Sequence, residues 1–172
     1  MTGTPYIGYE YRELTLPEDR VSFVLDGYES FGWVPDPHRP ARPRGHRVTV
    51  ALRRDRKILN KMELTRLQRH FEACLAQADR LEKAPGQAAA LWALLTALLG
   101  TAFLAGAVFA VTHQPPLYGL MVLLAVPGFG GWILPPFVHR WVLHRRTEAA
   151  RPLLDAQYDQ IYRLCEKGHA LL

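Results

Sequence analysis

No charged side chain occurs between residues 84 and 139, and this gap constrains the fold more than any other feature of the chain. All 21 Lys and Arg residues and all 16 Asp and Glu residues lie outside it. A water-soluble fold needs polar faces on its surface elements, and a segment of this length without a charge does not provide them. The gap therefore predicts a segment that lies in a lipid bilayer.

Two apolar runs within the gap are each long enough to cross a membrane. Residues 88–111 are rich in Ala and Leu, and residues 117–138 are rich in Leu, Val and Gly. A spanning helix needs about 20 mainly apolar residues to cross a hydrocarbon core about 30 Å thick. Because residues 112–116 read as a turn, we predict a two-helix transmembrane hairpin over residues 87–139.

Glycines and prolines in and near the hairpin lead to further expectations. Small residues let helix backbones approach closely in lipid. The glycines expected at helix contacts are Gly100, Gly106, Gly128, Gly130 and Gly131. Proline removes a helical hydrogen bond and clashes with the preceding turn, so we expect a kink near Pro127 and a helix break at Pro85 and Gly86.

Basic residues flank the hairpin on one side only. Residues 139–146 read HRWVLHRR after the second span, Arg80 and Lys83 precede the first, and the turn between the spans has no Lys or Arg. Positive residues mark the cytoplasmic side. The first residues lack a basic region followed by an apolar run, so no signal peptide is expected. We predict a multi-pass protein of the bacterial inner cell membrane with both termini in the cytoplasm.

The parts outside the hairpin have the periodicities of a small α+β domain and a helix. In residues 1–86, alternation over 6–16 and 47–53 predicts strands, and a short aromatic run at 31–34 predicts another. Pro17 opens a short helix, residues 58–83 form a long amphipathic helix, and the Pro- and Arg-rich segment 35–46 reads as a loop. The predicted fold class is a membrane α+β protein. It has a cytoplasmic β-α-β-β-α domain, the hairpin, and a cytoplasmic C-terminal helix in residues 140–172.

The densest basic cluster consists of Arg53, Arg54, Arg56 and Lys57. One interpretation is a binding surface for anionic lipid headgroups or a protein partner, since each cation near an anionic leaflet contributes about 1 kcal/mol. The other is a solvated junction between strand and helix whose charges pair with Asp55 and Glu63 and contribute little. The sequence leaves both open.

No residue pattern points to catalysis, a metal or a cofactor. The seven histidines and two cysteines lack metal-ligand spacing, and no nucleophile, base and acid pattern occurs. No aromatic and basic motif for nucleic acid is present. The spans also lack the ionisable groups that carriers bury. We therefore expect neither an enzyme nor a metal, cofactor or nucleic-acid binder.

Six segments resemble a known family. They are residues 9–11 (YEY), 26–33 (DGYESFGW), 53–64 (RRDRKILNKMEL), 67–69 (LQR), 127–135 (PGFGGWILP) and 158–168 (YDQIYRLCEKG). Together they resemble a small uncharacterised family of two-span membrane proteins from Firmicutes-type bacteria, and the Arg-rich loop suggests a GC-rich member. The resemblance implies the two-span architecture and transfers no catalytic residue.

Three functional hypotheses follow. The first is a non-enzymatic membrane-anchored scaffold or regulator, whose cytoplasmic domain binds a partner and whose hairpin binds lipid or another membrane protein. The second is a homo-oligomeric channel or permeability factor built from the hairpins. The third, with the least support, is a lipid-modifying enzyme at the membrane interface that uses His139, Arg140, His144 and Arg145.

Overall fold

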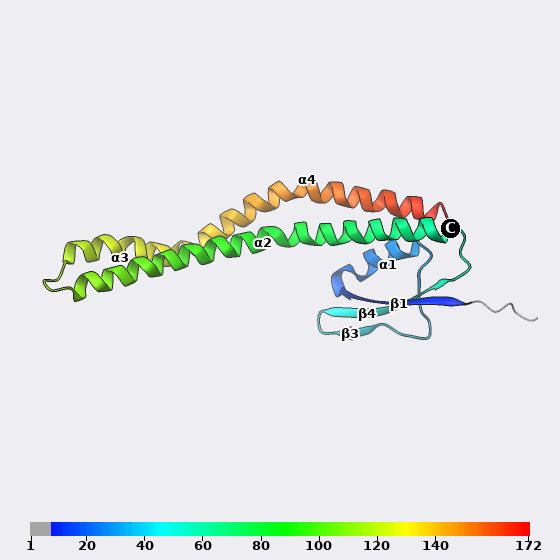
Figure 1. Ribbon diagram of the computed structural model, residues 1–172, viewed down its shortest axis with the longest axis horizontal. Coiled ribbons are helices and arrows are strands. Elements are labelled where there is room, and N and C mark those ends of the chain that lie inside the picture. Colours follow the sequence, from blue (N-terminus) through cyan, green and yellow to red (C-terminus); the bar gives the residue numbers. More distant parts are fainter. Residues whose placement is uncertain (1–7) are drawn as a thin grey trace, which may run out of the picture. The chain divides into compact units, whose positions relative to one another are not determined.

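The computed structural model describes residues 8–172 and divides into two compact units. Unit 1 contains the chain up to Gln77 together with Ala156–Leu172, and unit 2 contains Ala78–Asp155. Figure 1 shows a small sheet and several long helices, which make the protein a mixed α+β chain. Tyr6 and Ile7, where the first predicted strand begins, lie outside the described residues.

The sheet of unit 1 is antiparallel and is built around strand β4 (Arg47–Asp55). Strand β1 (Tyr9–Pro17) pairs with β4 along its whole length, from Tyr9 opposite Asp55 to Pro17 opposite Arg47. Strands β2 (Val34–Pro35) and β3 (Arg42–Arg44) also pair with β4. The predicted loop 35–46 therefore contains a short strand. Pro43 fits in β3 because an edge position tolerates a residue that cannot donate to the ladder.

Alternation along the two long strands gives the sheet one apolar face. Val50 and Leu52 on β4 are buried, and Leu14 and Leu16 on β1 pack against the same core. After a 3₁₀ turn, η1 (Glu18–Arg20), helix α1 (Val21–Glu29) lies against this face. Gly27 lets α1 approach its neighbour, since a Cβ there would lie 2.3 Å from Cζ of Phe71.

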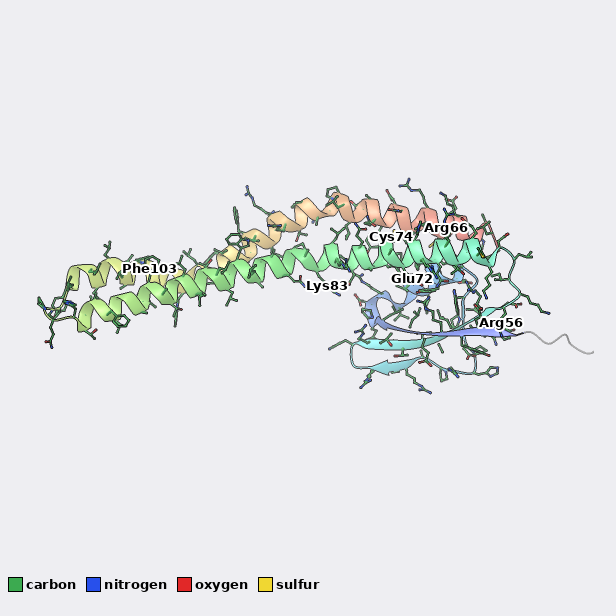
Figure 2. All side chains as sticks on the ribbon, in the orientation of Figure 1. Arg56, Arg66, Glu72, Cys74, Lys83 and Phe103 are labelled. Atoms are coloured by element: carbon green, nitrogen blue, oxygen red, sulfur yellow. The ribbon has the colours of Figure 1, made fainter. Side chains whose placement is uncertain are left out.

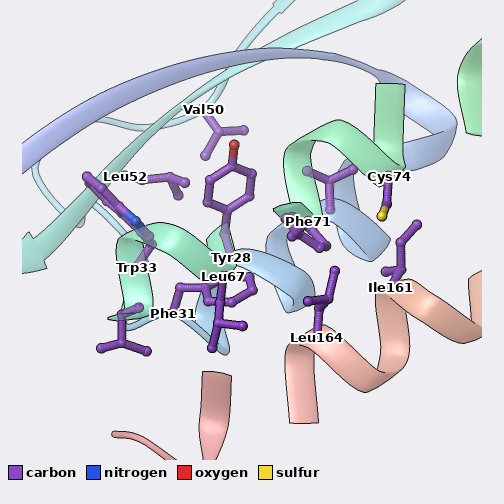
Figure 3. Packing of buried hydrophobic residues seen from close by; sticks show 12 residues of the cluster. Tyr28, Phe31, Trp33, Val50, Leu52, Leu67, Phe71, Cys74, Ile161 and Leu164 are labelled. Atoms are coloured by element: carbon purple, nitrogen blue, oxygen red, sulfur yellow. The ribbon is translucent and has the colours of Figure 1, made fainter. Parts of the chain in front are cut away.

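The core of unit 1 combines segments from both ends of the chain. The first turns of helix α2 (Lys61–Thr112) contribute Leu64, Leu67 and Phe71, and the last turns of helix α4 (Pro135–His169) contribute Ile161 and Leu164. Figure 3 shows Leu67, Phe71, Ile161 and Leu164 around the aromatic residues of the α1 region. The ring centroid of Phe71 lies 5.6 Å from that of Tyr28 and 5.3 Å from that of Phe31. The sheet and three helices therefore share one core.

Helix α2 is not broken where the sequence suggested. It continues through Pro85, so the predicted break at Pro85 and Gly86 is wrong. An interior proline costs about 3 kcal/mol through one lost hydrogen bond and a local clash. Ala, Leu, Glu and Gln, which favour helices, surround Pro85, and its ring is buried. The helix therefore tolerates this proline.

The second apolar run forms two helical segments. Helix α3 (Tyr118–Ile133) passes through Pro127, and the break falls at Leu134, where α3 and α4 meet at an angle of 50°. Pro135 and Pro136 occupy the first turn of α4, where missing N–H groups cost least. By length and composition one helix, α2, is suited to span a membrane. The bent pair α3 and α4 is a second only if both halves form one span.

Candidate functional site

The four residues of the predicted basic cluster do not form one surface. Arg53 and Arg54 are neighbours on β4 and therefore point to opposite faces of the sheet. The side chain of Arg54 is 4% exposed, donates to Glu10 at 3.0 Å and lies over the Trp33 ring at 4.6 Å. Arg53 instead lies over the Tyr9 ring at 4.7 Å. Arg54 is thus part of the interior, and Arg53 is not.

Arg56 and Lys57 follow β4 and are exposed. Figure 2 labels Arg56 on unit 1. Their backbone N–H groups are fixed, with Arg56 donating to the carbonyl of Gly8 at 3.0 Å and Lys57 to the Asp55 carboxylate at 2.8 Å. Their side chains have no ion pair within residues 8–172. The cluster therefore supplies two free cations to the surface of unit 1.

A polar network beneath the sheet connects β1, β4, α1 and α2. One carboxylate oxygen of Glu72 accepts hydrogen bonds from Arg12 at 2.6 Å, Tyr28 at 2.9 Å and Gln68 at 2.8 Å. Trp33 donates to the amide oxygen of Gln68 at 2.9 Å. Arg54 connects this network to a second carboxylate. Its guanidinium lies 3.5 Å from the amide oxygen of Gln68 and also donates to Glu10.

The contacts of this network determine the ionisation of its acids. Burial acts to raise the pKa of Glu72, but hydrogen bonds from Gln68, Arg12 and Tyr28 outweigh it and hold that pKa below its ordinary value. The hydrogen bond from Lys61 lowers the pKa of Glu10. Burial, followed by the charge of Glu72, raises the pKa of Tyr28. Each charge has a partner, so the network is built to join the sheet to α2.

An exposed face of α2 in unit 1 combines cations with apolar side chains. Met62, Arg66, Arg69 and His70 share one side of the helix at spacings of three and four, opposite the buried stripe of Leu64 and Phe71. With Lys61 and Thr65 they line a shallow groove of about 500 Å³. Met62 is 89% exposed and the adjacent Leu59 75% exposed. We call this surface the α2 basic face.

The α2 basic face was not predicted from the sequence, because its cations are not adjacent in the chain as those of residues 53–57 are. The available signal was helical spacing, since positions 62, 66, 69 and 70 form a second stripe on the predicted helix. Arg69 has no ion pair in the described chain, and Arg66 has one exposed pair with Glu63 at 3.6 Å. The face therefore has positive charge available to a ligand.

Unit 2 is packed through its smallest residues. Gly100, Gly128 and Gly131 are buried where α2 and α3 touch. A Cβ on Gly128 would lie 2.7 Å from Cγ of Leu104, and one on Gly106 would lie 3.3 Å from Leu124. Gly130 faces open space. Four of the five glycines expected at helix contacts thus lie next to the neighbouring helix of the same chain.

Large apolar side chains of unit 2 lie on its outside. Those exposed by about half or more on α2 include Leu94, Leu98, Leu99, Val108 and Phe109, and those on α3 include Leu123, Val126, Phe129, Trp132 and Ile133. Trp132 donates to the Thr101 hydroxyl at 3.2 Å, which ties α3 to α2. Soluble proteins bury large apolar residues, so this distribution is inverted.

No group of three or more His, Cys, Asp or Glu side chains suited to a metal occurs within residues 8–172. Cys74 and Cys165 are free thiols, and burial raises the pKa of both. His139, Arg140, His144 and Arg145, the candidates for an enzymatic site, lie along α4, and Arg145 packs over the Trp141 ring at 4.7 Å.

Comparison of the chain with protein-family models, with curated proteins and with solved structures finds no match.

Proposed function

We propose that this chain is an integral membrane protein whose unit 2 spans the bilayer as a helical hairpin, and whose unit 1 is a cytoplasmic, non-enzymatic module that binds a protein partner. The inverted packing of unit 2 carries the membrane part of the proposal. Only 17% of the most apolar window of α2 is buried. Leaving a Val, Leu or Phe side chain in water costs about 1.5–3 kcal/mol, and lipid removes that cost for all of them at once.

The cytoplasmic assignment of unit 1 rests on charge. Arg80 and Lys83 precede the apolar part of α2, and Arg140, Arg145 and Arg146 follow the second apolar run, whereas residues 112–116 carry no Lys or Arg. This bias supports a cytoplasmic position for both ends of the hairpin. Unit 1 is formed from the segments that flank those ends.

The α2 basic face supports the partner-binding part. Exposed Met62 lines the same groove as Arg66 and Arg69, and this combination matches the chemistry of protein interfaces, where Met and Arg are enriched. The complementary partner is an acidic surface with an apolar centre. The buried network of Arg54 and Glu72 would hold the scaffold of this face, because it joins α2 to the sheet.

Cysteine accessibility tests the membrane topology. His113→Cys places a thiol in the turn between α2 and α3, and Met62→Cys places one on unit 1. In spheroplasts, a membrane-impermeant maleimide should label His113→Cys at once and Met62→Cys only after permeabilisation. Equal labelling of both would refute the orientation, and release of the protein by alkaline carbonate would refute membrane integration.

Photo-crosslinking in intact membranes tests the partner. A photoreactive residue at Met62 should give one adduct of defined mass, and Arg66→Glu with Arg69→Glu should abolish it. Tyr11, also exposed but on the other side of the sheet, is the matched control and should give none. An adduct that persists in the double Glu variant would exclude the α2 basic face as the binding surface.

The pore hypothesis draws less support from the geometry. It needs small residues at contacts between copies, whereas Gly100, Gly128 and Gly131 are used within one chain. Gly130 keeps an open side and is the position at which a contact between copies is best tested.

A further inference from the structure

We propose that a groove in unit 2 binds the headgroup of an anionic phospholipid from the cytoplasmic leaflet. The proposal rests on the membrane placement given above and adds a ligand to it. The groove measures about 560 Å³, within the range of about 300–1,000 Å³ that is usual for small-molecule sites. Trp92 of α2 forms one wall. The other wall is a face of α4 formed by Val138, Trp141, Val142, Arg145, Arg146 and Ala149.

The α4 wall changes character along its length. Its residues recur at spacings of three and four and so share one side of the helix. Val138 and Val142 are apolar and adjoin the charge-free run, whereas Arg145 and Arg146 lie one to two turns further along. An ordered phospholipid has the same sequence of groups, with acyl chains, then glycerol, then phosphate. The wall therefore matches the order of acyl chain and phosphate in the ligand.

The cationic end of the groove, formed by Arg145 and Arg146, has positive charge available for a ligand. No carboxylate lines the groove, and within residues 8–172 neither Arg145 nor Arg146 has an ion pair. The nearest acid along the helix, Glu148, pairs with Arg151 at 3.3 Å. Guanidinium groups offer forked N–H donors that match the oxygens of a phosphate. A lipid phosphodiester satisfies this end, and a zwitterionic headgroup does so less well because it brings its own cation.

The two indoles define the position of the headgroup. Trp141 lies under the guanidinium of Arg145 at 4.7 Å, which orients that group. In the described part of the chain, neither the Trp141 nor the Trp92 indole N–H has an acceptor. Both rings are exposed by half or more. Indoles favour the membrane interface, where the N–H can donate to phosphate or ester oxygens.

Lipid titration of the full chain in detergent micelles tests the proposal by native mass spectrometry. Phosphatidylglycerol and phosphatidylcholine serve as probes. The double variant Arg145→Gln/Arg146→Gln should bind the first phosphatidylglycerol about 30-fold more weakly, because each near-surface arginine contributes roughly fivefold. Its affinity for phosphatidylcholine should be unchanged. The matched control, Arg140→Gln/Arg163→Gln, removes the same charge from the same helix outside the groove, leaves the Glu148–Arg151 pair intact and should bind within about threefold of the parent.

Several outcomes would overturn the site. They are an equal loss in the control pair, no loss in the groove pair, or displacement of the bound lipid by excess inorganic phosphate, which would identify the groove as a site for free phosphate. Carbonate extraction of the same variants separates the two proposals. A protein that stays in the membrane but shows no groove-dependent binding refutes only the lipid site, and a protein released from the membrane refutes the placement itself.

Discussion

Gly100 on α2 and Gly131 on α3 meet backbone against backbone. A Cβ atom on Gly131 would lie 2.4 Å from the Cα of Gly100, and one on Gly100 would lie 2.8 Å from the Cα of Gly131. Non-bonded atoms do not approach this closely, so the contact exists only because both positions lack a side chain. The large side chains around the two glycines are left to face outward.

We predict that Gly131→Ala destabilises the hairpin by about 1–3 kcal/mol, the usual cost of extra volume at a tight contact. Thermal unfolding of the protein in detergent micelles measures this. Gly130→Ala is the matched control on the adjacent residue, where a Cβ meets nothing within 4 Å. Because Gly130 lies inside a helix, this variant should be as stable as the parent or up to about 1 kcal/mol more stable. Equal losses in both variants would mean that the Gly100 contact does not hold α2 to α3.

Gly130→Leu addresses contacts between copies. Because the position is open within the chain, we expect the variant to keep its fold and to have the same mass in micelles as the parent. A shift to a smaller assembly in native mass spectrometry would instead place Gly130 at a contact between copies. That result would favour the homo-oligomeric channel.

Arg53 and Arg54 should respond very differently to the same change. Arg54→Gln leaves Glu10 with one cation fewer and removes the stacking on Trp33, so we expect a loss of about 2–3 kcal/mol. Arg53→Gln removes one cation–π contact of a half-buried side chain and should cost less than about 1 kcal/mol. Hydrogen–deuterium exchange of the β1 and β4 amides in the full chain measures both. Similar exchange in the two variants would show that burial of Arg54 contributes nothing.

The same pair shows what sequence could and could not predict. Four cations in five positions read as one surface, but a strand sends alternate side chains to opposite faces, and only the fold reveals which face is inside. The α+β class, the two long strands and the amphipathic start of α2 followed from periodicity alone. The hub role of Glu72 did not, because its partners Arg12 and Tyr28 are distant in sequence.

The prolines show a second limit of prediction from the sequence. The sequence predicted a helix break at Pro85 and a kink near Pro127, yet α2 continues through Pro85 and α3 continues through Pro127, and a helix ends only before Pro135. A single proline removes one backbone hydrogen bond, and a long helix tolerates that loss. Pro135 and Pro136 together remove two donors at consecutive positions, and the chain accommodates them by starting a new helix there.

Acid should weaken unit 1. The folded-state pKa values of Glu72 and Glu10 lie below their ordinary value of 4.5, so their stabilising effect is present above about pH 4.5 and is lost as pH falls through the folded values. The melting temperature of unit 1, followed by the near-UV circular dichroism of its aromatic core, should therefore fall as pH drops from 5 to about 3. Glu72→Gln should flatten this dependence and lower stability at pH 7 by about 1–3 kcal/mol.

Glu63→Gln is the control for that experiment. Glu63 has only an exposed pair with Arg66 at 3.6 Å, so its loss should change neither the slope nor, beyond about 0.5 kcal/mol, the stability. A slope unchanged in Glu72→Gln would assign the acid sensitivity to other groups.

The two native thiols should react slowly. Burial raises the pKa of Cys74 and Cys165, so the thiolate fraction at pH 7 is lower than for a free cysteine. We expect iodoacetamide to modify both at least about tenfold more slowly than the exposed thiol of Met62→Cys, as followed by mass spectrometry. Fast modification of Cys74 in the untreated protein would show that the core around Phe71 opens readily.

The composition of the unit 1 core also limits when this unit can fold during synthesis. Phe31 and Phe71 leave the ribosome early, but Ile161 and Leu164, which complete their packing, emerge only after every residue of α3. The core side chains of the amino-terminal segments therefore remain partly exposed until the whole apolar run has been synthesised. A ribosome stalled at Asp155 would therefore hold a unit 1 whose core still lacks Ile161 and Leu164.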